Sequence, residues 1–137
     1  LEIIDASSTL IKRLDVLTAD YHSFAELLTH FLQGLKIEPH HIFGAVCFAS
    51  KILQNKTVTN ANYKWEQTDG DAIKHKFGLK GMVLLNDFEA CGYAVPILDK
   101  KQIISLTNQE IPSFTGNLKI MLVGPGTGLG VCLLSQK

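Results

Sequence analysis

Residues 81–90 read Gly-Met-Val-Leu-Leu-Asn-Asp-Phe-Glu-Ala, an apolar run that stops abruptly at two polar residues. The run from Met82 to Leu85 is typical of a buried strand, and a helix is expected to begin at Asn86 and Asp87. In open α/β sheets the carboxyl ends of the strands face the ligand crevice. The stretch therefore predicts an α/β fold in which Asn86 and Asp87 lie where a ligand binds.

Asp87 has a second interpretation that needs no chemistry. Aspartate is among the best N-cap residues of helices, because its carboxylate accepts hydrogen bonds from the first free backbone N–H groups. The local sequence favours this capping role for Asp87 over a catalytic one. A second motif is therefore required before a reaction can be assigned to the junction.

The second motif is the glycine-rich stretch Val-Gly-Pro-Gly-Thr-Gly-Leu-Gly-Val at residues 123–131. Alternate glycines allow the backbone to approach an anion closely with its N–H groups free, as phosphate binding requires. The dinucleotide-binding pattern does not match, because Leu129 or Val131 stands where its last glycine is required. The P-loop pattern does not match either, because no lysine follows the glycines. Apolar runs on either side, 118–123 and 129–134, instead predict a β-hairpin. The stretch is either a phosphate-binding hairpin loop or an ordinary tight hairpin.

The remaining strands are predicted from apolar runs and their turns. Runs over residues 1–5 and 9–17 predict a hairpin around a short polar turn. The nearly all-apolar run 42–49 predicts a mid-sheet strand that is covered on both faces. Residues 56–59 predict an edge strand before a polar loop.

Helices are expected between these strands. Ser23 and Glu26 form a capping box, and apolar residues repeat at helical spacing after it. Gly78 suits the left-handed end of a second helix, and Pro96 stops a third. The expected limits are Ser23 to Leu35, Thr68 or Asp69 to Lys76, and Phe88 to Val95.

Length and composition indicate one compact domain. The chain has 137 residues, and its 46% hydrophobic content suffices for a core without disulfide or metal. Basic and acidic residues, thirteen of each, balance, which removes the positive surface expected of a general nucleic-acid or acidic-membrane binder. Apolar runs are far shorter than the roughly 20 residues needed to span a bilayer. We therefore expect neither nucleic acid nor membrane as a partner.

Cysteine and histidine usage predicts an intracellular protein without a metal site. Cys47, Cys91 and Cys132 are widely spaced in apolar surroundings, which is typical of free, buried thiols in a reducing cytosol. No CxxC pair occurs, and the adjacent His40 and His41 follow a proline in an expected loop. The chain opens without a secretory signal pattern. Together these features predict a cytoplasmic protein with no metal of its own.

The two motifs together resemble the bacterial-type glucokinases of the hexokinase and actin-like ATPase superfamily. Residues 85–98 are similar to the family's "NDF-x-A…A-I/V-P" segment, which holds its catalytic aspartate. Residues 124–131 are similar to the family's second phosphate loop, "G-x-G-T-G-L-G". Residues 21–23 and 62–65 resemble its "Y-x-S" and "N-x-x-W" landmarks. The resemblance covers most of the chain.

The same resemblance implies a fold and an extent. The family's opening "D-x-G-G-T" phosphate loop and its later "E-x-x-H" sugar segment have no counterpart in residues 1–137. The chain is therefore expected to be a partial N-terminal, small lobe of a two-lobed sugar kinase, without the first phosphate loop and the C-terminal lobe. The implied fold is α/β, a ribonuclease H-like (actin-like ATPase) lobe with a mixed β-sheet and flanking helices. Such a piece is expected to be inactive by itself and prone to self-association.

By resemblance, the reaction is transfer of the γ-phosphoryl group of ATP to the 6-hydroxyl of glucose, the entry step of glycolysis. Asp87 is the implied catalytic base, and Asn86 and Asn62 are implied to bind sugar hydroxyls. Mg²⁺ is implied to carry the remaining phosphate charge, and a homodimer of the full-length protein is compatible with the family. The residues implied to meet the ATP phosphates belong to the glycine loop: Gly126, Thr127 and Gly128.

Two other functions remain open at this point. A relative in the same superfamily could phosphorylate another hexose or an amino sugar, or sense a sugar without reacting; Phe88 and Glu89 favour the glucokinase branch. A non-catalytic half-domain that mediates interactions is the alternative from a different class, and the absent first phosphate loop is its best argument. Three nearby side chains are expected to pack, not react: Trp65 in the core, and Tyr93 and Cys91 beneath the site.

Overall fold

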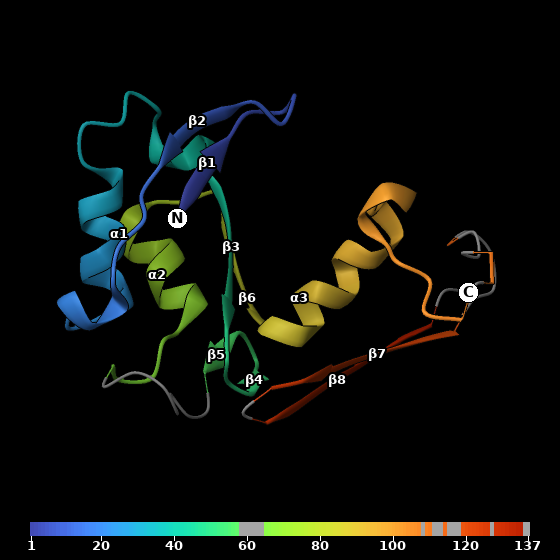
Figure 1. Ribbon diagram of the computed structural model, residues 1–137. Helices are drawn as coiled ribbons and strands as arrows, with labels where there is room; N and C mark the ends of the chain where they lie inside the picture. Colours follow the sequence, from blue (N-terminus) through green and yellow to red (C-terminus); the bar gives the residue numbers. More distant parts are fainter. Residues whose placement is uncertain (58–64, 108, 111–113, 115–118, 127, 136–137) are drawn as a thin grey trace. The chain divides into compact units, whose positions relative to one another are not determined.

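The computed structural model describes residues 1–57, 65–107, 109–110, 114, 119–126 and 128–135 (Figure 1). These residues belong to two compact units, 1–84 and 85–137, where length and composition predicted one domain. Helices and strands occur in both units, so the α/β class is confirmed.

The first unit begins with a hairpin and continues with helices and short strands. Its elements are β1 (Glu2–Ile4), β2 (Leu10–Arg13), η1 (Thr18–Asp20), α1 (Phe24–Leu32), η2 (Pro39–His41), β3 (Phe43–Phe48), β4 (Ile52–Leu53), β5 (Lys56–Thr57), α2 (Gly70–Phe77) and β6 (Gly81–Asn86), whose last residues enter the second unit. β1 pairs with β2 antiparallel, as the apolar runs predicted. β4 pairs with β5 antiparallel, so the predicted edge strand is present as β5, and its residues 58 and 59 lie outside the described part of the chain.

β3 pairs with β6. The residues just before the two strands lie side by side, because the amide of Lys80 donates to the carbonyl of Ile42 over 2.9 Å, so both strands run from the same edge of the sheet. The prediction that β3 is covered on both faces is wrong. Phe43 is 66% exposed, and Cys47 on the same face is exposed as well, whereas Phe48 is buried. Within the first unit, the described elements cover only the face that carries Val46 and Phe48.

Both helices of the first unit start where local chemistry predicts, but α1 ends at Leu32, before the expected Leu35. The Ser23 hydroxyl accepts from the amide of Glu26 over 3.1 Å, which begins α1. Asp69, one of the two predicted candidates, caps α2 by accepting from the amides of the first turn. Gly78 ends α2 with a φ of 63°, a left-handed conformation that glycine adopts without strain.

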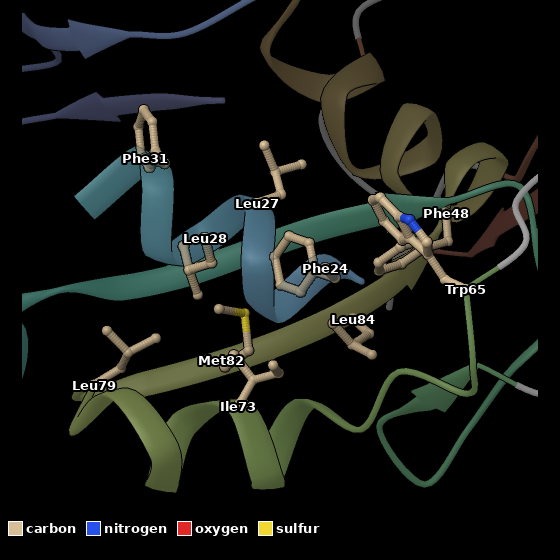
Figure 2. Packing of buried hydrophobic residues seen from close by; sticks show 10 residues of the cluster. All are labelled: Phe24, Leu27, Leu28, Phe31, Phe48, Trp65, Ile73, Leu79, Met82 and Leu84. Carbon is tan, nitrogen blue, oxygen red and sulfur yellow. The ribbon is translucent and has the colours of Figure 1, made fainter. Parts of the chain in front are cut away.

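The core of the first unit lies between α1, α2 and the two central strands. Figure 2 shows its side chains converging: Phe24, Leu27, Leu28, Phe31, Phe48, Trp65, Ile73, Leu79, Met82 and Leu84. Trp65 is only 8% exposed, its ring lies 6.4 Å from that of Phe24, and its indole N–H donates to the carbonyl of Tyr21 over 2.7 Å. The predicted packing role of Trp65 is therefore confirmed.

Asn55 joins the β4–β5 turn to β6. Its Nδ2 group donates to the carbonyl of Met82 over 3.0 Å, and its Oδ1 atom accepts from the amide of Leu84 over 2.8 Å. These two bonds imitate a strand pairing along the edge of β6, which leads directly into the Asn86–Asp87 junction. The backbone of Asn55 has a φ of 60°, which asparagine tolerates better than most residues.

The second unit contains the helix that follows β6 and one long hairpin. Its elements are α3 (Asp87–Ala94), η3 (Val95–Ile97), η4 (Lys100–Gln102), β7 (Lys119–Pro125) and β8 (Leu129–Ser135). β7 and β8 pair antiparallel in unbroken register, from Lys119 opposite Ser135 to Pro125 opposite Leu129. The predicted third helix and glycine hairpin are both confirmed.

The cysteines correct one prediction. None of the three is in a disulfide, as their spacing predicted, but Cys47 and Cys91 are exposed and Cys132 is half-buried. Small apolar neighbours indicated burial, yet only Cys132 lies on a face that packs against a described element, since its Sγ atom lies next to Gly92 of α3. No helix in the described part of the chain is long and apolar enough to cross a membrane.

Candidate functional site

The helix cap at the junction is Asn86, not Asp87. The Oδ1 atom of Asn86 accepts from the amides of Phe88 over 2.9 Å and of Glu89 over 3.3 Å. The cap falls there because the backbone of Asn86 is extended, with φ −67° and ψ 147°, whereas Asp87 is already the first helical residue. The purely structural interpretation of Asp87 as the N-cap is therefore wrong.

The Asp87 carboxylate retains one uncommitted oxygen. Its Oδ1 atom accepts from the amide of Phe88 over 3.0 Å. Among the described residues, its Oδ2 atom has no hydrogen-bond or ion-pair partner. The residue as a whole is half-buried. Such a carboxylate can orient a hydroxyl group and accept its proton.

The outer glycines of the hairpin are required by packing. Gly124 and Gly130 lie opposite each other in the β7–β8 register. A Cβ atom added to either residue would overlap the ring of Phe88. The ring therefore lies directly against this pair of glycines, and any side chain there would displace it.

The inner glycines are not required by the described fold. Gly126 and Gly128 are exposed. A Cβ atom on Gly128 would meet no described atom within 4 Å, and one on Gly126 would meet only the carbonyl of Gly128 at 3.8 Å. The open backbone at these two positions allows a ligand to approach closely.

One detail of the phosphate-loop prediction needs correction. The amide of Gly126 is not free, because it donates to the carbonyl of Gly128 over 2.9 Å and closes the turn. Two residues assigned from the sequence, Asn62 and Thr127, lie outside the described residues.

The face of α3 that meets the hairpin also differs from expectation. Phe88 and Gly92, one helical turn apart, face the hairpin, and a Cβ atom on the buried Gly92 would lie 2.7 Å from the Sγ atom of Cys132. Cys91 and Tyr93, predicted to fill space beneath the site, are exposed, Tyr93 by 65%. The reason is helical geometry: neighbours of Gly92 are rotated by about 100° to either side of the packed face.

Sequence reasoning missed two contacts, one that holds β6 and one within the site. Asn55 follows Gln54 between Ile52-Leu53 and Lys56-Thr57, a two-residue polar step that is a signal for a tight hairpin turn with positive φ. Phe88 was noted only as a family landmark, although the spacing of Gly124 and Gly130 around a hairpin turn predicts a flat surface for a ring. Neither pattern reveals the contact itself.

Comparisons with known proteins show the family to which the chain belongs. A family model named Glucokinase matches residues 1–137. The chain belongs to the glucokinase family. The glucokinase of Colwellia psychrerythraea is 26% identical over 84% of the chain, and a glucokinase-like protein of Xylella fastidiosa (strain 9a5c) is 31% identical over 88%. The glucokinase of Photorhabdus laumondii is 26% identical over 98% of the chain.

A solved structure shares the fold of this glucokinase family member. The crystal structure of a glucokinase from an Antarctic psychrotroph matches 98% of the chain with a TM-score of 0.72 and 23% identity. The match covers 44% of that glucokinase. Likewise, the chain spans 33%, 35% and 40% of the lengths of the three relatives above.

Proposed function

We propose that residues 1–137 belong to the N-terminal, small lobe of a two-lobed, ribonuclease H-like (actin-like ATPase) sugar kinase. The protein transfers the γ-phosphoryl group of ATP to the 6-hydroxyl of glucose, as the family name suggests. The proposal rests mainly on the packing of α3 on the β7–β8 hairpin, within the second compact unit. That packing places a carboxylate with an uncommitted oxygen and a glycine turn with an open backbone in the same unit.

Asp87 is the proposed catalytic base. A sugar hydroxyl is far too weak an acid to ionise near neutral pH, so the Oδ2 atom would orient the 6-hydroxyl and accept its proton during transfer. The bond between the 6-oxygen and the γ-phosphorus forms while the bond from that phosphorus to the β-phosphate oxygen breaks, leaving ADP. Asn86 and Asn62 would hold other sugar hydroxyls, since an amide both donates and accepts hydrogen bonds.

The glycine turn is the proposed contact for the ATP phosphates. Gly126, Thr127 and Gly128 are the residues concerned, and the lack of any described packing requirement for glycine at Gly126 and Gly128 supports this role. Because the amide of Gly126 already closes the turn, the amide of Gly128 is the better donor to a phosphate oxygen.

Magnesium would arrive with the nucleotide. The described residues include no cluster of three histidine, cysteine, aspartate or glutamate side chains that could hold a metal ion. Mg²⁺ is commonly bound mainly by substrate phosphates, where it offsets their negative charge. The partners of the proposed enzyme are thus glucose and Mg²⁺-ATP, and the expected compartment is the cytoplasm. A homodimer of the full-length protein is compatible with the family.

Replacement of Asp87 tests the proposal. In the full natural chain, Asp87→Asn should keep glucose binding within about tenfold and lower kcat by roughly 10² or more, the effect of losing a general base. Glu89→Gln is the matched control, because Glu89 is an exposed carboxylate two residues further along α3. A coupled assay for glucose 6-phosphate measures kcat, and isothermal titration measures glucose binding.

Three other results of these measurements would each contradict a different part of the proposed function. A near-normal kcat in Asp87→Asn would remove Asp87 from the role of base. A natural chain that phosphorylates another hexose or an amino sugar in preference to glucose would change the substrate. A chain that binds neither ATP nor sugar would support the non-catalytic alternative.

A further inference from the structure

We infer that Phe88 is a positioning residue that sets the spacing between the Asp87 carboxylate and the phosphate-binding turn of the β7–β8 hairpin. The inference rests on the proposed function, because it concerns the reach of a base to the group that is transferred. It assigns Phe88 no contact with either substrate.

The backbone of Phe88 is tied to the residues that would meet the sugar. Its amide donates to the Oδ1 atom of Asn86 over 2.9 Å and to the Oδ1 atom of Asp87 over 3.0 Å. These two bonds restrict both side chains at once, and they leave the Oδ2 atom of Asp87 without a described partner. The orientation of the proposed base therefore depends on where the first turn of α3 lies.

The side chain of Phe88 is tied to the hairpin. Its ring lies against Gly124 and Gly130, which are cross-strand partners. The next pair in the register, Pro125 opposite Leu129, is the last before the turn that holds Gly126 and Gly128. One residue thus contacts both the Asn86–Asp87 junction and the strand ends that carry the turn, and a change in ring size would move the turn relative to the carboxylate.

The ring atoms nearest to the two glycines differ, and this difference allows a specific test. The three atoms nearest to an added Cβ atom on Gly124 are the outer ring atoms Cζ, Cε1 and Cε2. The three nearest to an added Cβ atom on Gly130 are Cε2, Cδ2 and Cζ, so this set includes an inner ring atom. Leucine lacks the outer atoms but keeps equivalents of the Cδ atoms. Phe88→Leu should therefore accommodate Gly124→Ala and not Gly130→Ala.

The experiment is a set of variants in the full natural chain, with kcat and both KM values measured by the coupled assay. Phe88→Leu and Gly124→Ala should each lower kcat by about ten- to a hundredfold, since small misplacements of reacting groups cost rates of that order. The KM for glucose should change less than about threefold. The double variant Phe88→Leu/Gly124→Ala should regain at least tenfold in kcat over Gly124→Ala, whereas Phe88→Leu/Gly130→Ala should not regain activity over Gly130→Ala.

Two controls separate positioning from folding. Tyr93→Leu makes the same aromatic-to-leucine change on the exposed side of α3 and should leave kcat unchanged. Phe88→Met keeps more of the apolar volume, so it serves if Phe88→Leu fails to fold. If the Phe88 variants have a lowered Tm and an unchanged kcat per folded molecule, the residue is merely structural and the inference is overturned.

The inference and the proposed function fail in distinguishable ways. A wild-type chain that forms no glucose 6-phosphate refutes the proposed function and the inference with it. An active wild-type chain in which both double variants respond alike refutes the inference alone.

Discussion

Removal of the Asn55 side chain should destabilise the first unit severely. Asn55→Ala breaks the bonds to the carbonyl of Met82 and from the amide of Leu84, and these two residues are 7% and 2% exposed. A buried donor or acceptor left without a partner costs about 1–3 kcal/mol, so the two groups together cost roughly 2–6 kcal/mol. A third bond, to the exposed Asp71, adds little.

The backbone of Asn55 adds a second contribution. Its φ is 60°, a left-handed conformation that costs alanine about 1–2 kcal/mol. The expected loss of unfolding free energy is thus about 3–8 kcal/mol, a large part of the roughly 5–15 kcal/mol that stabilises a typical domain. Urea unfolding measures it, and the chain's single tryptophan, Trp65, reports from the core of the same unit.

Two further variants separate the backbone from the side chain. Asn55→Gly removes the hydrogen bonds without the conformational strain, so it should lose about 2–6 kcal/mol. Gln54→Gly changes the neighbouring turn residue, whose φ is also positive at 49°, and should be neutral or slightly stabilising. If Asn55→Gly matches the wild type within about 0.5 kcal/mol, the side-chain bonds do not hold β6 and the reasoning is refuted.

Two other predictions follow from the glycine loop and from α2. Gly124→Ala should cost about 1–3 kcal/mol by overpacking against Phe88, whereas Gly128→Ala should leave stability within about 0.5 kcal/mol and weaken ATP binding, by isothermal titration, more than glucose binding. Equal stability losses at the two glycines would contradict this division. The Lys56 ammonium, 2.6 Å away, and the first amides of α2 lower the pKa of Asp69 below its ordinary value of 3.8. The stability that Asp69 contributes is therefore complete above pH 3.8 and is lost as the pH falls through the lowered pKa. Urea unfolding should show that Asp69→Asn is less stable than the wild type near neutral pH and that this difference shrinks in strong acid. A difference that does not depend on pH would contradict the reasoning.

Local chemistry explains why much of the fold could be predicted from the sequence. A hydroxyl at Ser23, a carboxylate at Asp69 and a glycine at Gly78 each satisfy or terminate a helix within a few residues of the chain. Such signals need no knowledge of distant segments. The strand-to-helix junction at residues 86–87 and the β7–β8 hairpin were predictable for the same reason.

The errors concern what lies against a given face. An all-apolar strand such as β3 has the same pattern whether one face or two are covered, so the exposure of Phe43 could not be predicted. The cap at Asn86 differs from the expected Asp87 by one residue, because both side chains suit an N-cap and only the backbone angles decide. The exposure of Cys91 and Tyr93 depends on the packing of Gly92, a contact with a distant strand.

The alternating glycines show how one motif can serve two purposes. Read along the chain, Gly124, Gly126, Gly128 and Gly130 form a single pattern that predicts anion binding. In the hairpin, the outer pair accepts the Phe88 ring and the inner pair has no described packing role. The "NDF" segment and the glycine segment therefore depend on each other physically: a side chain on either outer glycine would displace the residue that follows Asp87. Two segments that resemble the family separately are, in the folded chain, parts of one packing arrangement.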